Sequence, residues 1–115
     1  MRKSSEPVFW FLFGAGGVIA AFLAPIHIVL TGIVGPAGGL ESALEYERVL
    51  ALVSHPVTKL YLFMLISLPL FHWAHRFRFT VVDLGLRASK RGIAFATYGS
   101  AAIGSILSAL VLIRL

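Results

Sequence analysis

The sequence predicts an all-α integral membrane protein that crosses the bilayer three times, with helices at about residues 8–34, 57–79 and 92–113. Of its 115 residues, 58% are hydrophobic and only 13% are charged. A soluble domain of this length cannot bury so much apolar surface. Each apolar run also reaches the roughly 20 residues that are needed to span a bilayer. We therefore expect residues 1–115 to form a single transmembrane domain.

The composition excludes several kinds of site. The chain has no cysteine, so it cannot hold a disulfide, an iron–sulfur cluster or a covalently attached haem. Ten Lys and Arg against five Asp and Glu give a formal charge of +5, which in a soluble protein would suggest a nucleic-acid partner. Here the charges lie at the ends of apolar runs, as is typical of membrane topology, and no nucleic acid is expected. No phosphate-binding loop, carboxylate pair or nucleophile–base motif is visible.

The first predicted helix, residues 8–34, carries no formal charge. A cleaved signal peptide is the alternative, but the run is longer than such peptides need, and two more apolar runs follow. Small residues spaced four apart, Gly16, Ala20 and Ala24, predict the close approach of another helix. Pro25 removes a backbone hydrogen bond and predicts a kink.

The connection to the second helix contains two different segments. Residues 32–39 (GIVGPAGG) are rich in glycine and end the first helix. Residues 41–54 (ESALEYERVLALVS) place apolar side chains at helical spacing, with Glu41, Glu45 and Arg48 among the polar positions. This pattern predicts a short amphipathic helix at the membrane surface. A solvated helical loop is the alternative.

The other two predicted helices carry different packing features. The second, residues 57–79, begins with Lys59 and Tyr61, which suit an interface, and contains Pro69, which predicts another kink. The third, residues 92–113, carries two rows of small residues with a spacing of four, and small side chains predict tight helix packing. The first row is Gly92, Ala96, Ser100, Gly104 and Ser108, and the second is Ala101, Ser105 and Ala109.

Basic residues are divided unequally between the two sides of the predicted bundle. Because cytoplasmic segments of membrane proteins carry the excess of Lys and Arg, we expect the N-terminus inside and the C-terminus outside. The inner side would hold Arg2, Lys3, Arg76, Arg78, Arg87, Lys90 and Arg91, and the outer side only Arg48, Lys59 and Arg114.

This topology places several polar side chains at one depth. The first helix begins and the second helix ends on the same side, so Trp10 lies level with His72, His75 and Arg76. An indole, an imidazole and a guanidinium suit a quinone head group, whose two oxygens accept hydrogen bonds and whose ring stacks on aromatic side chains. Arg76 would stabilise negative charge on a quinone oxygen, and His75 would donate a hydrogen bond or pass a proton. The alternative is that Trp10, Arg76 and their neighbours only anchor the helices at the interface.

A haem is the other redox site that the histidines suggest. Two axial histidines must lie at matching depth on facing helices. His27 and His55 are predicted toward the outer side, whereas His72 and His75 share one helix and are three residues apart. We therefore expect no haem held by this chain alone, while a haem that takes a ligand from a partner stays open.

Several short blocks in a specific order run along nearly the whole chain. They are EPVFW at 6–10, LFGAGG at 12–17, AP at 24–25, YERVLA at 46–51, LPL at 68–70, HR at 75–76 and DL at 83–84. With these blocks the chain resembles the D subunit of the four-subunit quinol–fumarate reductase, one of the two small hydrophobic membrane anchors of that complex.

The resemblance implies an anchor that attaches the catalytic subunits to the cytoplasmic face of the bacterial inner membrane in anaerobic fumarate respiration. The implied partners are the second hydrophobic anchor (the C subunit), the iron–sulfur protein (the B subunit) and the flavoprotein (the A subunit). Menaquinol would be oxidised between the anchors and the iron–sulfur protein. The electrons would then reach FAD, where fumarate becomes succinate. The iron–sulfur clusters and FAD would belong only to the partners, and no haem b is expected.

The resemblance also implies roles for single residues. Trp10, His75 and Arg76 match the quinol site of the family, which favours a binding site over interface anchoring. His72 is given no role. No buried carboxylate is expected near the site in this chain, so a carboxylate base would come from the partner anchor. Two other functions stay open: the anchor of a succinate dehydrogenase, which a haem-binding histidine in the partner would favour, and a structural membrane subunit without a redox role.

Overall fold

The computed structural model describes residues 4, 6–86 and 89–115, and every regular element in this part of the chain is a helix. A first rod consists of α1 (Glu6–Val18), η1 (Ile19–Leu23), α2 (Ala24–Val29) and η2 (Leu30–Val34), of which η1 and η2 are π-helical. The other helices are α3 (Tyr46–Ser54), α4 (Pro56–Asp83) and α5 (Lys90–Arg114).

Three segments are long and apolar enough to cross a bilayer, which confirms the predicted fold class. They are Pro7–Val34, Pro56–Asp83 and Lys90–Arg114, each of which contains a strongly apolar stretch of 18 residues. The helix predicted to end at residue 79 continues to Asp83 as part of α4, because Val81 and Val82 extend its half-buried face. Of the basic residues used to predict the orientation, Arg2, Lys3 and Arg87 lie outside the described residues.

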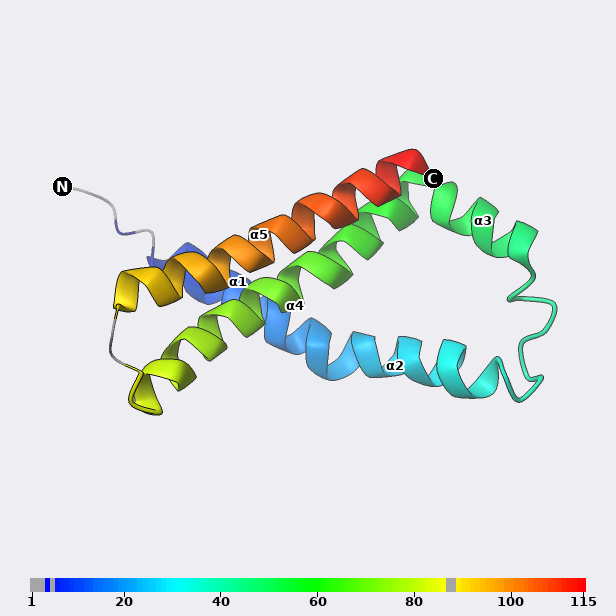
Figure 1. Ribbon diagram of the computed structural model, residues 1–115. Helices are drawn as coiled ribbons and strands as arrows, with labels where there is room; N and C mark the ends of the chain where they lie inside the picture. Colours follow the sequence, from blue (N-terminus) through cyan, green and yellow to red (C-terminus); the bar gives the residue numbers. More distant parts are fainter. Residues whose placement is uncertain (1–3, 5, 87–88) are drawn as a thin grey trace.

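α4 and α5 form an antiparallel hairpin and lie side by side along most of their length (Figure 1). α1 packs against α4, but beyond η1 the rod turns away, and α2 runs apart from the hairpin toward the opposite end of the molecule (Figure 1). α3 lies at that end beside the C-terminus, where the Ser54 hydroxyl donates to the carbonyl of Leu115 at 3.1 Å. The first rod therefore meets the hairpin where α1 crosses α4 and separates from it toward the other end of the molecule.

The predicted break at Pro25 takes the form of a π-helical segment. Proline has no N–H to donate, and directly before it the Ala24 N–H donates to the carbonyl of Ile19. This bond is one residue longer than an α-helical bond, and such π segments accompany bends in helices. Pro69 differs, because α4 continues through it without a change of helix type.

Local hydrogen bonds fix the ends of α4 and α5. Before α4, the Val57 N–H donates to Nδ1 of His55 at 3.2 Å. After α4, Gly85 adopts a left-handed φ of 94° and closes the turn that ends the helix, a conformation that favours glycine. Before α5, the Ser89 hydroxyl accepts a hydrogen bond from the Gly92 N–H at 3.0 Å.

The amphipathic helix predicted over residues 41–54 is shorter in the structure. α3 begins only at Tyr46, and residues 41–44 belong to turns. Leu44 packs back against Gly35, so the chain reverses direction there, and extended backbone at Glu45 separates this reversal from the helix. The predicted start was wrong because the contact between Leu44 and Gly35 is tertiary and leaves no local mark in the sequence.

Small side chains form the packed face between α4 and α5. Ala74 and Ala101 are completely buried, and Thr97 and Ser105 are buried beside them. The second predicted row of α5 therefore packs as expected. The first row does not pack against α4 in its N-terminal half, where Gly92, Ala96 and Ser100 are exposed. The reason is that the crossing with α4 turns the second row inward. Large apolar side chains instead face outward, as expected for contact with lipid or another chain.

Candidate functional site

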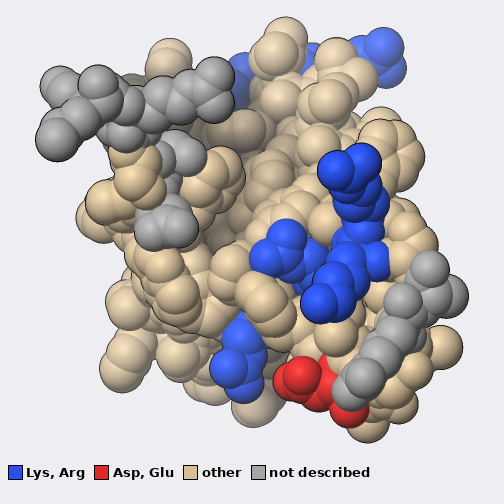
Figure 2. Space-filling view, turned by 90° about the vertical axis from the view of Figure 1, so that its left-hand side faces the viewer, with Lys and Arg blue, Asp and Glu red and all other residues tan. Residues whose placement is uncertain are grey.

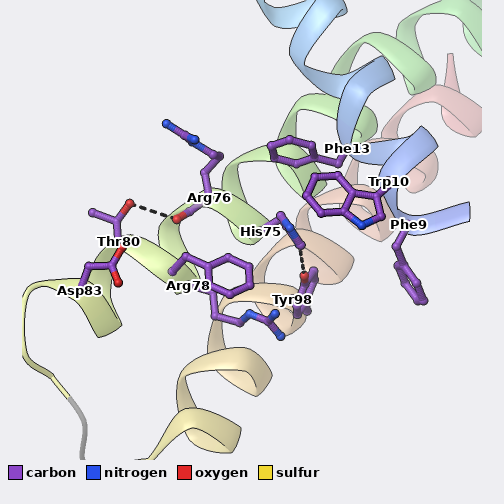
Figure 3. Close-up of a pocket in the computed structure, with 10 residues that line it drawn as sticks. Phe9, Trp10, Phe13, His75, Arg76, Arg78, Thr80, Asp83 and Tyr98 are labelled. Carbon is purple, nitrogen blue, oxygen red and sulfur yellow. Dashed lines mark hydrogen bonds between the residues drawn. The ribbon is translucent and has the colours of Figure 1, made fainter. Parts of the chain in front are cut away.

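A cavity of about 830 Å³ lies between the N-terminal part of α1, the C-terminal part of α4 and the first turns of α5. Figure 3 shows side chains from all three helices around it. It is lined by Phe9, Trp10, Phe13, His75, Arg76, Arg78, Phe79, Thr80, Asp83 and Tyr98. The three side chains predicted from the sequence, Trp10, His75 and Arg76, are thus brought to one cavity. Their role in binding stays a prediction.

α1 supplies the aromatic wall of the cavity. Trp10 and Phe13 lie one helical turn apart and therefore on one face of α1. The ring centroid of Trp10 lies 6.0 Å from that of His75, with the rings at 68°. Phe13 lies 4.8 Å from His75 and packs edge-on against Trp10 at 5.8 Å. This wall exists because Gly16, one turn further along α1, lets the two helices meet.

His75 lies at the centre of the site and is held from several sides. Its Nδ1 lies 2.7 Å from the hydroxyl of Tyr98 on α5, and the Phe79 ring lies 5.1 Å away. No described residue is hydrogen bonded to its Nε2. The imidazole is therefore fixed through one nitrogen, and the other remains able to bond a ligand.

Two arginines flank the site in different ways. Arg76 is exposed, and in Figure 3 its side chain extends away from the pair formed by His75 and Tyr98. Arg78 is half-buried, and its guanidinium lies 4.5 Å from the centroid of the Phe79 ring and 5.5 Å from that of Tyr98. Among the described residues, no carboxylate pairs with either guanidinium. Both cations thus remain available to an anionic or carbonyl group.

The end of the molecule that holds the cavity is predominantly basic. Figure 2 shows Lys and Arg side chains clustered on this end, with a small acidic area at one edge. The cavity includes one carboxylate, Asp83, in the last turn of α4. We expected no buried carboxylate near the site in this chain. Asp83 is exposed, yet it contributes an acidic group to the cavity lining, a position that the sequence analysis did not assign to it.

A second, smaller cavity of about 150 Å³ adjoins the first. Its walls are almost entirely apolar, and it shares Phe9, Phe13, His75 and Tyr98 with the larger cavity. Leu12 and Phe71 complete it. His75 and Tyr98 therefore line both the larger cavity, which has several polar groups, and the smaller apolar one.

His72, which received no role from the sequence, connects α4 to α1. Its Nδ1 lies 2.8 Å from the carbonyl oxygen of Phe13, and its ring stacks on the Phe13 ring at 4.4 Å. It lines neither cavity. His72 therefore holds Phe13, a residue of the aromatic wall, from outside the two cavities.

The remaining two histidines have hydrogen-bond partners away from the cavity. His27 Nε2 lies 2.7 Å from the hydroxyl of Tyr61 on α4, and His55 caps the start of α4. Within residues 4, 6–86 and 89–115, no group of three His, Asp or Glu side chains is arranged to hold a metal ion.

Sequence reasoning missed Tyr98 and the position of Arg78. The depth argument that joined Trp10 to His75 also applies to α5, which begins on the same side, and it could have identified Tyr98. For Arg78 the signal was weaker, because alternating basic and aromatic residues at 75–79 do not reveal which side chain faces which helix.

The fold and the cavity define a small integral membrane protein with a ligand-sized cavity at the basic end of its helices. The chain belongs to the family of fumarate reductase D subunits, whose family model matches residues 1–113. This assignment confirms the resemblance in the sequence. The match includes the first predicted helix.

Individual relatives support the assignment over nearly the full length. The chain is 43% identical to the fumarate reductase D subunit of Mycobacterium tuberculosis over 116 residues, which cover 99% of this chain and 91% of the relative. It is 36% identical to the fumarate reductase D subunit of Shewanella putrefaciens over 115 residues, which cover 99% of this chain and 94% of the relative. These similarities favour a fumarate reductase subunit over the two alternative functions.

Proposed function

We propose that the chain is a membrane anchor subunit of a fumarate reductase and that it forms half of a menaquinol oxidation site. The observation that carries the proposal is the meeting of Trp10, His75 and Arg76 at one cavity. The relatives are named as one lettered subunit of fumarate reductase, which implies a complex of several chains. The proposed partners are the second hydrophobic anchor, the iron–sulfur protein and the flavoprotein.

The cavity fits a quinol head group in size and chemistry. Ligand sites for small molecules commonly have volumes of roughly 300–1,000 Å³ and mostly apolar walls with a few polar groups, and this cavity has about 830 Å³. Phe9, Trp10, Phe13 and Phe79 offer aromatic surfaces for stacking. The indole N–H of Trp10 and the guanidinium groups of the arginines can donate hydrogen bonds to the two ring oxygens, and Nε2 of His75 can accept one from a quinol hydroxyl.

The residues of this chain would bind and orient the quinol head group and accept a proton from it. Menaquinol supplies two electrons and two protons when it is bound and oxidised. Trp10 and Arg76 orient the head group through its oxygens, His75 accepts one of the two protons at Nε2, and a base of the partner anchor would accept the other. This chain has no cysteine to hold an iron–sulfur cluster, so the clusters and the FAD that would carry the two electrons to fumarate would be held by the partner subunits. The chain is thus a non-catalytic subunit of an oxidoreductase.

The basic end of the bundle is proposed to face the cytoplasm. Arg76, Arg78, Lys90 and Arg91 belong to the helix ends there, and an excess of Lys and Arg marks the cytoplasmic side of membrane proteins. The flavoprotein and the iron–sulfur protein would then dock on the face shown in Figure 2. This orientation gives a cytoplasmic N-terminus and a periplasmic C-terminus in the bacterial inner membrane.

The test compares Arg76→Leu with Arg114→Leu, a change of an exposed arginine outside the cavity lining and at the opposite end of the molecule from the proposed docking face. We expect menaquinol–fumarate turnover to fall about 100-fold in Arg76→Leu, while the amount of membrane-bound flavoprotein stays at the wild-type level. Arg114→Leu should change neither quantity by more than about twofold. A parallel loss of turnover and of bound flavoprotein in Arg76→Leu would make Arg76 an assembly residue, and unchanged turnover would place the quinol site elsewhere.

A further inference from the structure

We propose that Tyr98 is the positioning residue of the site: its hydroxyl holds His75 at Nδ1 and thereby directs Nε2 to the ligand. The inference rests on the proposed quinol site and adds a residue from the third transmembrane helix to it. Its basis is the distance of 2.7 Å between Nδ1 of His75 and the Tyr98 hydroxyl.

The hydrogen bond crosses between two helices, and both of its residues line both cavities. His75 belongs to α4 and Tyr98 to α5, and both side chains are half-buried. Figure 3 shows Tyr98 approaching His75 from the side opposite to Phe13. The imidazole is therefore bonded to α5 on one side and covered by the aromatic wall of α1 on the other.

A neutral imidazole carries its proton on one nitrogen, and a hydroxyl such as that of Tyr98 can either accept a hydrogen bond from Nδ1–H or donate one to Nδ1. We assign the proton to Nδ1. With Nδ1–H donating to the Tyr98 hydroxyl, Nε2 presents a lone pair to the cavity. It can then accept the proton of a ligand hydroxyl: the O–H bond breaks, an Nε2–H bond forms, and Tyr98 keeps its own proton. The Nδ1–H bond to Tyr98 persists in the imidazolium that results, so the ring does not turn during the transfer.

Arg78 also contacts Tyr98. Its guanidinium lies 5.5 Å from the centroid of the Tyr98 ring and 4.5 Å from that of Phe79. A cation at this distance from an aromatic face is attracted to it. Tyr98 is thus contacted by a cation at its ring and by an imidazole at its hydroxyl.

The chain offers a matched control for a structural role of the same bond. His27 and Tyr61 form a second histidine–tyrosine hydrogen bond of 2.7 Å, and neither residue lines either of the two cavities described above. Tyr98→Phe and Tyr61→Phe therefore remove the same kind of hydroxyl from the same kind of pair. Each keeps the aromatic ring, so packing is preserved in both variants.

The experiment uses the assembled complex in membranes, with turnover expressed per membrane-bound flavoprotein. For Tyr98→Phe we expect kcat for menaquinol oxidation to fall about 10- to 100-fold, KM to change by less than about twofold, and the pH of half-maximal turnover to change. Fumarate reduction driven by a reduced viologen dye, which bypasses the quinol site, should stay unchanged. Tyr61→Phe should match the wild type in all of these quantities.

A measurement on the imidazole itself completes the test. In complex labelled with ¹⁵N-histidine, His75 should appear as the single tautomer with the proton on Nδ1, and Tyr98→Phe should give a mixture of tautomers. The inference is overturned if Tyr98→Phe behaves as Tyr61→Phe does, since the bond would then be dispensable for turnover. It is also overturned if Tyr98→Phe loses the bound flavoprotein, since the bond would then be structural. Full quinol turnover in His75→Ala and Arg76→Leu would instead reject the proposed site as a whole. Loss of turnover in those two variants, combined with normal Tyr98→Phe, would reject only the role of Tyr98.

Discussion

The backbone of Gly16 lies directly against the carbonyl oxygen of Leu68. A Cβ atom at this position would overlap that oxygen and would lie only 2.8 Å from Cβ of His72. α1 therefore crosses α4 at a distance that glycine alone permits. One turn before the crossing Phe13 meets His72, and one turn before that Trp10 approaches His75. The close contact at Gly16 thus determines the spacing of the aromatic wall from the imidazole.

Substitution of Gly16 should disrupt this crossing even when the added group is a single methyl. We expect Gly16→Ala to reduce membrane-bound flavoprotein and to lower the thermal stability of the complex, because the methyl would meet backbone that cannot rotate away. The cost of such overpacking is about 1–3 kcal/mol. Gly14→Ala is the control, since nothing lies within 4 Å of a Cβ there. Equal stability of the two variants would show that α1 and α4 do not meet at Gly16.

A graded response is expected at Gly104 on α5. A Cβ at Gly104 would meet Cδ1 of Leu70 at 2.9 Å, and that methyl group lies at the end of a flexible side chain. Gly104→Ala should therefore be tolerated within about 1 kcal/mol, whereas Gly104→Leu should cost about 1–3 kcal/mol and reduce assembly. The measurement is the amount of intact complex after detergent extraction at increasing temperature. A wild-type yield from Gly104→Leu would contradict close packing of α5 on α4 at this level.

His72 should behave as a packing residue rather than as a site residue. We expect His72→Phe to keep the stacking on Phe13 but to lose the hydrogen bond to the Phe13 carbonyl, at a cost of about 1 kcal/mol. Thermal unfolding of the complex would report this loss. Menaquinol turnover per bound flavoprotein should remain within about threefold of the wild type. A collapse of turnover in a stably assembled His72→Phe complex would mean that His72 acts in the site.

The orientation in the membrane can be tested with reporter fusions. A phosphatase that is active only outside the cytoplasm should be active when it is fused after Leu115 and inactive when it is fused at Gly85, in the turn that follows α4. The reason is the excess of Lys and Arg at the end where α4 stops and α5 starts. The reverse pattern of activities would invert the proposed topology and would move the cavity to the periplasmic side.

The helices were largely predictable because length and apolarity alone specify a membrane span. The same information placed Trp10 and His75 at a common depth, since it determined where the first helix begins and the second ends. The start of α3 was not predictable, because it depends on Leu44 folding back onto Gly35. The amphipathic spacing of side chains in the sequence includes residues 41–45, although the backbone of these residues is not helical.

The lining of the cavity was only partly predictable. Depth follows from topology, but the direction of a side chain around its helix depends on which faces pack together. Tyr98 lies eight residues after Lys90, near the depth of His75, yet only the packing of α5 on α4 turns it toward the imidazole. Arg78 follows Arg76 by two residues and consequently lies on another side of α4, where it packs on Tyr98. The same uncertainty about direction explains why both small-residue rows of α5 were expected to pack, although Gly92, Ala96 and Ser100 of the first row are exposed.

The π-helical segment before Pro25 gives α1 and α2 different rotational phases. A hydrogen bond that spans one extra residue rotates all later side chains around the axis relative to the earlier ones. The face that carries Gly16 toward α4 therefore does not continue unchanged into α2, where Ile26 and Ile28 are 53% and 64% exposed, although the side chain of His27 reaches Tyr61 of α4. α1 is matched to its own chain, whereas much of the surface of α2 is turned toward whatever surrounds the bundle. A single-residue deletion within 19–23 would merge the two phases and present the surroundings with a different surface, while the composition of the helix would hardly change.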